Sequence, residues 1–226
     1  MNDEEMNFLY NSVDVYINLA SNEGFGLGSL EALTVGTPII VNVTGGLQDQ
    51  CGFKNEKGEY LTDRLGDEAC KFIEQNKDNP FFCYVPFTIP HAAMQSPEGR
   101  IAPWRKKFPE FEKMTGKYGG SVITNPVAAF AAMMEHMDED VGRILDLLEE
   151  LKIDDNTLVN FTSDNGPHKE GGHKPDFFDS NGPLKGYKRD LYEGGIRVAT
   201  VAWWPGKIES GSTSSHIAAG WDLLPT

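Results

Sequence analysis

The residues that decide the fold of this chain are 157–168, TLVNFTSDNGPH. The apolar run 157–162 predicts a buried strand, and the polar sequence Ser163-Asp164-Asn165-Gly166 ends it. Sites in open α/β sheets gather at the carboxyl ends of strands. An acid beside an amide offers hard oxygen ligands for a divalent cation such as calcium. The same residues are also common turn chemistry, so alone they support a turn as well as a ligand pair.

Two further stretches place reactive side chains next to predicted strands. Residues 81–91, FFCYVPFTIPH, put His91 just past a predicted buried strand at 81–85. Residues 186–197, GYKRDLYEGGIR, put a cluster of cations before a Gly-Gly turn and a predicted strand at 198–204. A histidine and a lysine that converge on a metal-linked pocket would suit an oxyanion such as sulfate or phosphate.

The remaining pattern predicts an α/β protein in which helices cover a sheet. Asn125-Pro126 is a good helix start, with proline at the first helical position. The helix that follows carries an apolar stripe that we interpret as core packing. The stripe consists of Phe130, Met133, Met134, Met137, Val141, Ile144, Leu145 and Leu148.

Upstream of that helix the sequence predicts several further elements. Strands are predicted at 13–19 and 37–41, with a short helix at 28–34 between them. Thr62 or Asp63 can cap another helix that ends no later than Asn79-Pro80. Residues 95–124, rich in proline, lysine and glycine, predict a long surface excursion.

The composition of the chain restricts the kinds of partner that it can bind. The chain has 226 residues, enough to bury a sizeable core, and a formal net charge of −14. That charge argues against a nucleic acid or an anionic membrane as partner, and a sulfated polyanion would need a local cluster of cations. No apolar run could span a bilayer. The acidic start lacks the pattern of a signal peptide, so we expect a cytoplasmic chain as written.

The three cysteines, Cys51, Cys70 and Cys83, show no metal-type pairing. They predict neither a disulfide framework nor a zinc knuckle. Cys70 and Cys83 lie within apolar patterns, which predicts positions in the core.

Four stretches in order resemble the sulfatases of the arylsulfatase type over about residues 58–226, the later half of their catalytic domain. These are residues 81–91, the Ala-Ala-Met helix with Asp138 and Val141-Gly142, residues 161–167, and residues 184–197. The resemblance implies an alkaline-phosphatase-like mixed sheet flanked by helices, here only in part. It also implies sulfuric ester hydrolysis, with a sulfated carbohydrate or aryl sulfate ester as substrate. The family is usually periplasmic, secreted or lysosomal.

The same resemblance implies roles for individual residues. Asp164 and Asn165 would be Ca²⁺ ligands. His91 and Lys188 would contact the sulfate group and neutralise or protonate the leaving ester, as catalytic and substrate-binding residues. His168 would be a further substrate-binding residue. His173 could join it, or be a solvated loop histidine.

One departure from the family bears directly on activity. Sulfatases attack with a formylglycine made in a Cys/Ser-x-Pro/Ala-x-Arg motif, beside an Asp-Asp pair that completes the calcium site. None of the three cysteines here lies in such a motif, so none can become formylglycine. We therefore expect a sulfatase-like fragment that is inactive as written. A phosphate-ester enzyme of the same superfamily and a non-catalytic module for sulfated glycans are the alternatives.

Residues of about 7–58 resemble a different family, the nucleotide-sugar-binding part of retaining GT-B glycosyltransferases. The resemblance rests on Glu23 and Glu31, eight positions apart, and on the glycines around them. It implies a Rossmann-like βαβ fragment in which Glu31 holds the ribose of a sugar nucleotide and Glu23 lies near the donor sugar. We therefore predict a glycosyltransferase-like part at 1–58 and a sulfatase-like part at 59–226, truncated at both ends. Two partial domains in one chain suggest a chimera, with a glycosyltransferase remnant as an alternative function.

Overall fold

The computed structural model describes residues 16–18, 39–41, 60–118, 121–219 and 222. The helices are α4 (Leu61–Asn76), α5 (Glu98–Lys107), α6 (Pro126–Glu150) and α7 (Glu193–Ile196). Short 3₁₀ turns occupy Pro109–Phe111, Asp154–Asn156 and Glu170–Gly172. The strands are β1 (Tyr16–Asn18), β2 (Ile39–Val41), β3 (Thr115–Tyr118), β4 (Ser121–Thr124), β5 (Val159–Phe161) and β6 (Val201–Trp203).

Helix α6 begins where the sequence predicts. The side-chain oxygen of Asn125 accepts a hydrogen bond from the Ala128 amide at 3.0 Å, which satisfies one of the free donors of the first turn. Asn125 adopts left-handed backbone with φ 49°, a conformation that asparagine tolerates well. Pro126 follows at the first helical position, where its missing N–H costs no hydrogen bond.

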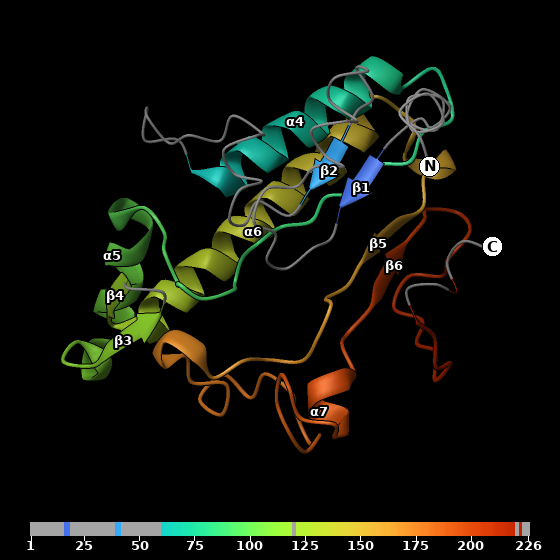
Figure 1. Cartoon of the computed structure of the whole chain (residues 1–226). Coiled ribbons are helices and arrows are strands. Elements are labelled where there is room, and N and C mark those ends of the chain that lie inside the picture. Colours follow the sequence, from blue (N-terminus) through green and yellow to red (C-terminus); the bar gives the residue numbers. More distant parts are fainter. Residues whose placement is uncertain (1–15, 19–38, 42–59, 119–120, 220–221, 223–226) are drawn as a thin grey trace, which may run out of the picture.

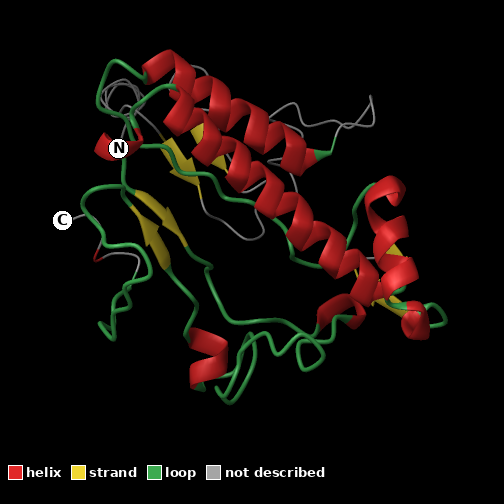
Figure 2. Ribbon diagram, turned by 180° about the vertical axis from the view of Figure 1, so that it is seen from behind, coloured by secondary structure: helices red, strands yellow, loops and turns green. Residues whose placement is uncertain are grey.

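The core lies around the first half of α6, with α4 along one side and α5 near its start (Figures 1 and 2). Phe130, Met133 and Met137 of the predicted stripe are buried there, Leu148 is buried near the end of the helix, and Met134 is exposed. The core cluster consists of Ile89, Met94, Ile123, Ala129, Phe130, Met133 and Met137. The small side chains of Ala128, Ala129 and Ala132 are fully buried, so neighbouring backbone can approach α6 closely.

The described strands form three separate pairs. β1 pairs with β2 in parallel, with Tyr16 opposite Ile39. β3 pairs with β4, and β5 with β6, in antiparallel fashion. The predicted strands at 13–19, 37–41, 157–162 and 198–204 are thus confirmed in shortened form, while the predicted helix at 28–34 lies outside the described residues. In the part of the chain that the structure describes, the pairs do not join into the expected mixed sheet.

The predicted strand at 81–85 is wrong. The segment has no strand, and Phe82 and Tyr84 are 66% and 40% exposed. A strand needs a neighbour for its backbone hydrogen bonds, and within the described residues nothing pairs with this segment. Cys83 in this segment and Cys70 on α4 are free and half-buried, so neither lies in the core as predicted.

Two helix predictions also need correction. Helix α4 starts at Leu61 with Tyr60 as its N-cap, so Thr62 and Asp63 lie inside the helix. Within the predicted excursion 95–124, residues Glu98–Lys107 form α5 despite Pro103 in its interior. Contacts with α6 explain this: the Trp104 indole donates to Glu135 at 2.8 Å, and Arg100 pairs with Glu139 at 2.6 Å. Tertiary contacts here override a weak local signal.

Within the described residues, no helix has the combination of length and apolar character that crossing a bilayer requires.

Replacing Asn125 by alanine should lower the free energy of unfolding by about 2–3 kcal/mol. The buried side chain caps α6 and also donates to the Phe108 carbonyl at 3.0 Å and to Glu112 at 3.2 Å. Urea unfolding followed by circular dichroism measures the loss. Asn125→Gly is the matched comparison, because it loses the same side-chain hydrogen bonds but tolerates the left-handed backbone, so it should be destabilised less than Asn125→Ala. A loss below about 0.5 kcal/mol for Asn125→Ala would contradict the capping role.

Candidate active site

Backbone hydrogen bonds hold three loops together around the residues that the sequence singled out. The Lys188 amide donates to the Pro167 carbonyl at 2.9 Å, and the Gly166 amide donates to the Gly195 carbonyl at 3.1 Å. The His168 ring bonds the Pro90 carbonyl at 2.9 Å. The loop after β5 is therefore attached to the loop before α7 and to the segment that carries His91.

The closeness of two of these loops requires glycine. A Cβ atom at Gly166 would lie 1.9 Å from the carbonyl oxygen of Gly194, a separation that no real contact allows. Gly166 and Gly194 are both buried. The glycine that ends the Asp-Asn-Gly sequence thus permits close backbone contact with the Gly-Gly turn.

His168 is buried and neutral. Its Nε2 donates to the Pro90 carbonyl, and its Nδ1 accepts from the Glu170 amide at 3.1 Å, which assigns the proton to Nε2. Burial lowers the pKa of His168, and the nearby charges of His91 and Lys188 lower it further, against the opposing effects of the Pro90 hydrogen bond and of Glu170. Both ring nitrogens are engaged with protein atoms, so in this structure His168 connects two loops.

His91 is more accessible than His168. Its Nδ1 contacts the Ala92 carbonyl, and its side chain is 43% exposed. Its ring lies 6.0 Å from that of His168 and meets Tyr118 edge-on at 5.7 Å. With Nδ1 donating to a carbonyl, Nε2 is the atom that remains for a ligand.

Glu170 joins the group, and the sequence analysis missed it. One carboxylate oxygen pairs with Arg189 at 2.5 Å, and the other lies 3.9 Å from Nε2 of His91. The Glu170 side chain is only 14% exposed. No local pattern indicates it, because its partners Arg189 and His91 lie far from it in the sequence.

His173 lies in the core, so the solvated-loop interpretation is wrong. The residue is 4% exposed, and its ring stacks on Phe130 with centroids 3.7 Å apart. Neither ring nitrogen has a hydrogen-bond partner among the described residues. Burial, with a smaller contribution from His168, lowers the pKa of His173 to about 3.

Asp164 and Asn165 follow β5 directly, as predicted, and Asp164 is exposed while Asn165 is half-buried. Burial raises the pKa of Tyr84, and the charge of Asp164 raises it further, so that carboxylate lies near the segment 81–91. The two side chains supply the oxygen donors that calcium prefers, but calcium takes about 6–8 ligands. Within the described residues, Asp164 is in no group of three acidic or histidine side chains close enough to hold one ion. The pair thus fits calcium in chemistry, as part of a ligand set.

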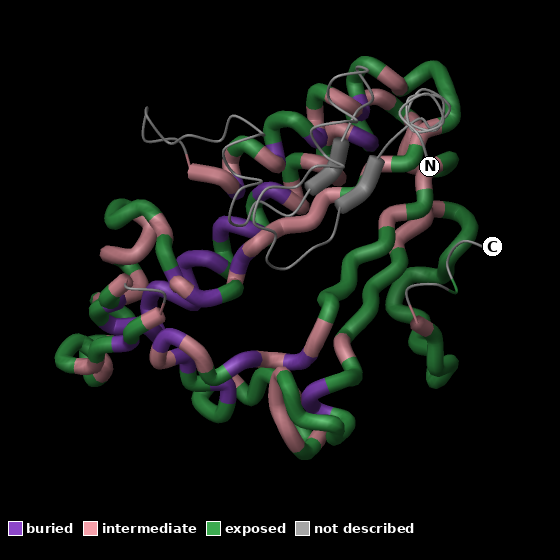
Figure 3. The backbone as a smooth tube through the Cα atoms, in the orientation of Figure 1, coloured by how far each residue is buried: buried purple, intermediate pink, exposed green. Residues whose placement is uncertain are grey.

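His91, Asp164, Asn165, His168 and Lys188 line one open cavity of about 3590 Å³. Ordinary ligand pockets have about 300–1,000 Å³, so this cavity is much larger than one small ligand needs. Its lining includes residues of α6 and of β5, two elements that stand apart in Figures 1 and 2. The strands β5 and β6 are mostly exposed in Figure 3. The loops therefore gather the predicted residues at the wall of a wide opening. Glu23 and Glu31 lie outside the described residues.

Comparison with known proteins defines the class. The sulfatase family profile matches residues 10–226. Human steryl-sulfatase is 36% identical over 170 residues, covering 74% of this chain and 26% of that protein. The N-acetylgalactosamine-6-sulfatase of Sus scrofa is 34% identical over 173 residues, covering 74% and 28%.

The crystal structure of Ps i-CgsB in complex with k-i-k-neocarrahexaose matches the fold with a TM-score of 0.66 and 24% identity, covering 99% of this chain and 51% of that one. The chain belongs to the sulfatase family. It spans about a quarter of the length of the curated relatives it matches.

The sulfatase match begins at residue 10 and so includes most of the segment 1–58. The glycosyltransferase resemblance and the chimera hypothesis gain no support from it. The division of the chain at residue 58 stays a prediction.

The stability of the chain should fall as the pH drops from 6.5 toward 3, in part because of His173. In the unfolded chain this histidine binds a proton below its ordinary pKa of 6.5, whereas the folded core keeps it neutral down to about 3. Its contribution is therefore complete above pH 6.5 and is lost at up to ~1.4 kcal/mol per pH unit below it. His173→Phe should flatten this dependence in urea unfolding measured at several pH values. His216→Gln, at an exposed position, should leave it unchanged; equal slopes for wild type and His173→Phe would contradict the assignment.

Proposed function

We propose that this chain is part of a sulfatase-like hydrolase and forms the wall of its active site that recognises the sulfate group. The observation that carries the proposal is the set of hydrogen bonds joining the loops of His91, Asp164-Asn165 and Lys188 around one cavity. Family membership supports sulfate esters as the ligand class. The relatives named steryl-sulfatase and N-acetylgalactosamine-6-sulfatase suggest sulfated sterols or sugars as substrates.

The charge and the accessibility of each residue suggest its role. The Lys188 ammonium would donate to the sulfate oxygens. Nε2 of His91 would face the ester oxygen, where a proton is needed as the alcohol leaves. Arg189 pairs with Glu170, so the positive charge of Arg189 compensates the carboxylate nearest to His91. His168 would keep the His91 segment in position through Pro90, and a direct contact with the substrate remains a prediction for it.

Asp164 and Asn165 would hold a calcium ion as two of its oxygen ligands. Bound there, the ion would polarise the sulfate oxygens and offset negative charge. The two residues follow β5, and the Gly166–Gly195 hydrogen bond fixes the end of their loop. No Cys/Ser-x-Pro/Ala-x-Arg motif occurs in these 226 residues. We therefore expect the 226-residue chain by itself to bind sulfate esters without hydrolysing them.

Of the other candidates, a non-catalytic module for sulfated glycans would use the same residues. A sugar-nucleotide site at Glu23 and Glu31 has no described residue to support it.

Binding of an aryl sulfate tests the proposal. Calorimetry with 4-nitrocatechol sulfate in calcium-containing buffer should give saturable binding to the full chain and no release of 4-nitrocatechol above the buffer rate. Lys188→Ala should weaken binding about tenfold or more, because a charge-assisted hydrogen bond is lost. Lys207→Ala is the matched control, since this exposed lysine does not line the cavity.

Two results would contradict the proposal. Equal affinities of wild type and Lys188→Ala would remove Lys188 from the sulfate site. Turnover by the full chain would show that these residues contain a nucleophile of their own.

A further inference from the structure

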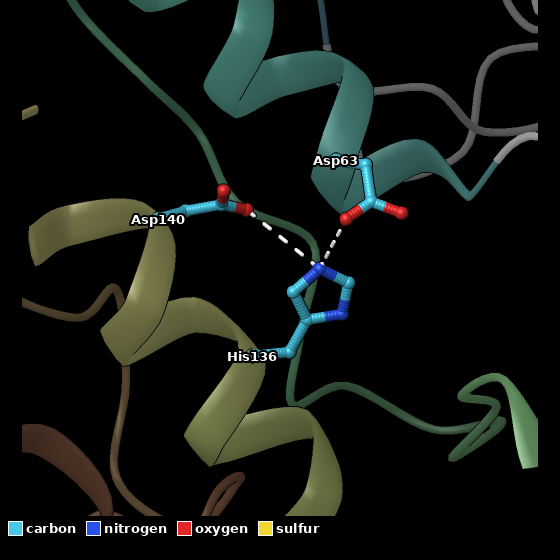
Figure 4. A group of neighbouring side chains, drawn as sticks. All are labelled: Asp63, His136 and Asp140. Atoms are coloured by element: carbon cyan, nitrogen blue, oxygen red, sulfur yellow. Dashed lines mark hydrogen bonds and ion pairs between the residues drawn. The ribbon is translucent and has the colours of Figure 1, made fainter. Parts of the chain in front are cut away.

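A second group of polar side chains lies between two helices, α4 and α6, that supply none of the residues assigned above to sulfate or calcium. Asp63 is in the first turn of α4, and His136 and Asp140 are on α6. The spacing of four places the last two on the same face of the helix, one turn apart. Figure 4 shows the three side chains pointing toward one another.

The distances suit a shared ligand. Nε2 of His136 lies 2.5 Å from a carboxylate oxygen of Asp63 and 3.9 Å from Oδ2 of Asp140. One ligand atom from each residue lies within 4.8 Å of the other two. Zinc at about 2.0–2.2 Å from tetrahedral ligands places those ligands about 3.4 Å apart. His136 and Asp140 need a small shift to reach this spacing, and Asp63, with a side chain 49% exposed, has room to move outward.

Two neighbours keep the group in place. The ring of Tyr60 stacks on His136 with centroids 5.1 Å apart and planes 20° apart, which fixes the plane of the imidazole. Gly66 on α4 faces Asp140, and a Cβ atom there would lie 2.6 Å from its carboxylate. A glycine at this point leaves space for a buried carboxylate between the helices.

Protein atoms balance the charge of the group only in part. Arg143 pairs with Oδ1 of Asp140 at 2.8 Å and with Asp67 at 2.5 Å. Oδ2 of Asp140 has no hydrogen-bond partner among the described residues, although the residue is only 2% exposed. A buried carboxylate oxygen without a partner costs free energy. This oxygen points at Nε2 of His136, which already faces Asp63, so the arrangement has two carboxylates directed at one nitrogen (Figure 4).

We propose that Asp63, His136 and Asp140 bind a divalent transition-metal ion of the zinc class. One imidazole nitrogen and two carboxylates form a ligand set that zinc accepts, whereas calcium is bound by oxygen ligands. The ion would balance the second carboxylate and join α4 to α6. A proton on His136 is the competing occupant, because an imidazolium could also lie between two carboxylates.

Zinc titration of the full chain after EDTA treatment and gel filtration tests the site. Calorimetry with Zn²⁺ alone should show saturable binding, and Asp140→Asn and Asp63→Asn should each raise the dissociation constant at least tenfold. Asp146→Asn, the same change at an exposed position of α6, should leave it unchanged. Asp164→Asn should also leave it unchanged, which separates this site from the proposed calcium ligands.

The outcomes are distinct. If wild type shows no saturable zinc binding, the group does not hold this ion and the proposal is overturned. If Asp140→Asn and Asp63→Asn bind zinc as tightly as wild type, the metal is bound elsewhere, for example at the loop histidines, and the proposal is also overturned. Asp63 is half-exposed, so Asp63→Asn keeps the test valid if Asp140→Asn fails to fold. Circular dichroism of each variant checks the fold.

Discussion

The packing of loops against the first turns of α6 is the constraint on which the site depends. Residues 126–133 are all buried, a pattern that a surface helix would not show. His173 stacks on Phe130 in these turns, and Ile89, two residues before His91, belongs to the same core cluster. The helix thus supports both the segment that carries His91 and the loop that follows β5. The Asn125 cap fixes where this support begins.

Local signals in the sequence were sufficient where a few neighbouring residues determine the structure. Asn125-Pro126 gave the start of α6 because capping needs only adjacent atoms. The strands β5 and β6 and the loop at Ser163–Gly166 followed from the change between apolar and polar residues. The segment 81–85 failed for the opposite reason, since a strand requires a partner from elsewhere in the chain and an apolar run cannot show whether one is present. Helix α5 was missed because its stabilising contacts come from Glu135 and Glu139 on α6.

The candidate site shows the same difference between local and long-range signals. The positions of Asp164 and Asn165 after β5 could be found from the sequence, because position after a strand is a local property, while their role as ligands stays a prediction. Glu170 could not, because its importance comes from Arg189 and His91, which are far from it in sequence. The group at Asp63 is similar: only His136 and Asp140 are related by helical spacing, and Asp63 joins them through the packing of α4 on α6. The resemblance at Glu23 and Glu31 stays a prediction, because it rests on a short motif within a segment that the sulfatase match also covers from residue 10.

Local charge reconciles the acidic chain with the anionic ligand proposed for it. The net charge of −14 opposes an oxyanion at long range, but salt screens interactions beyond about 8 Å at physiological ionic strength. What matters at the site is the set of groups within that distance. There the charges of Lys188 and His91 both act on His168, and Arg189 compensates Glu170. An acidic surface with a locally cationic loop would weaken non-specific attraction of polyanions while still allowing one sulfate group to bind where the loops meet.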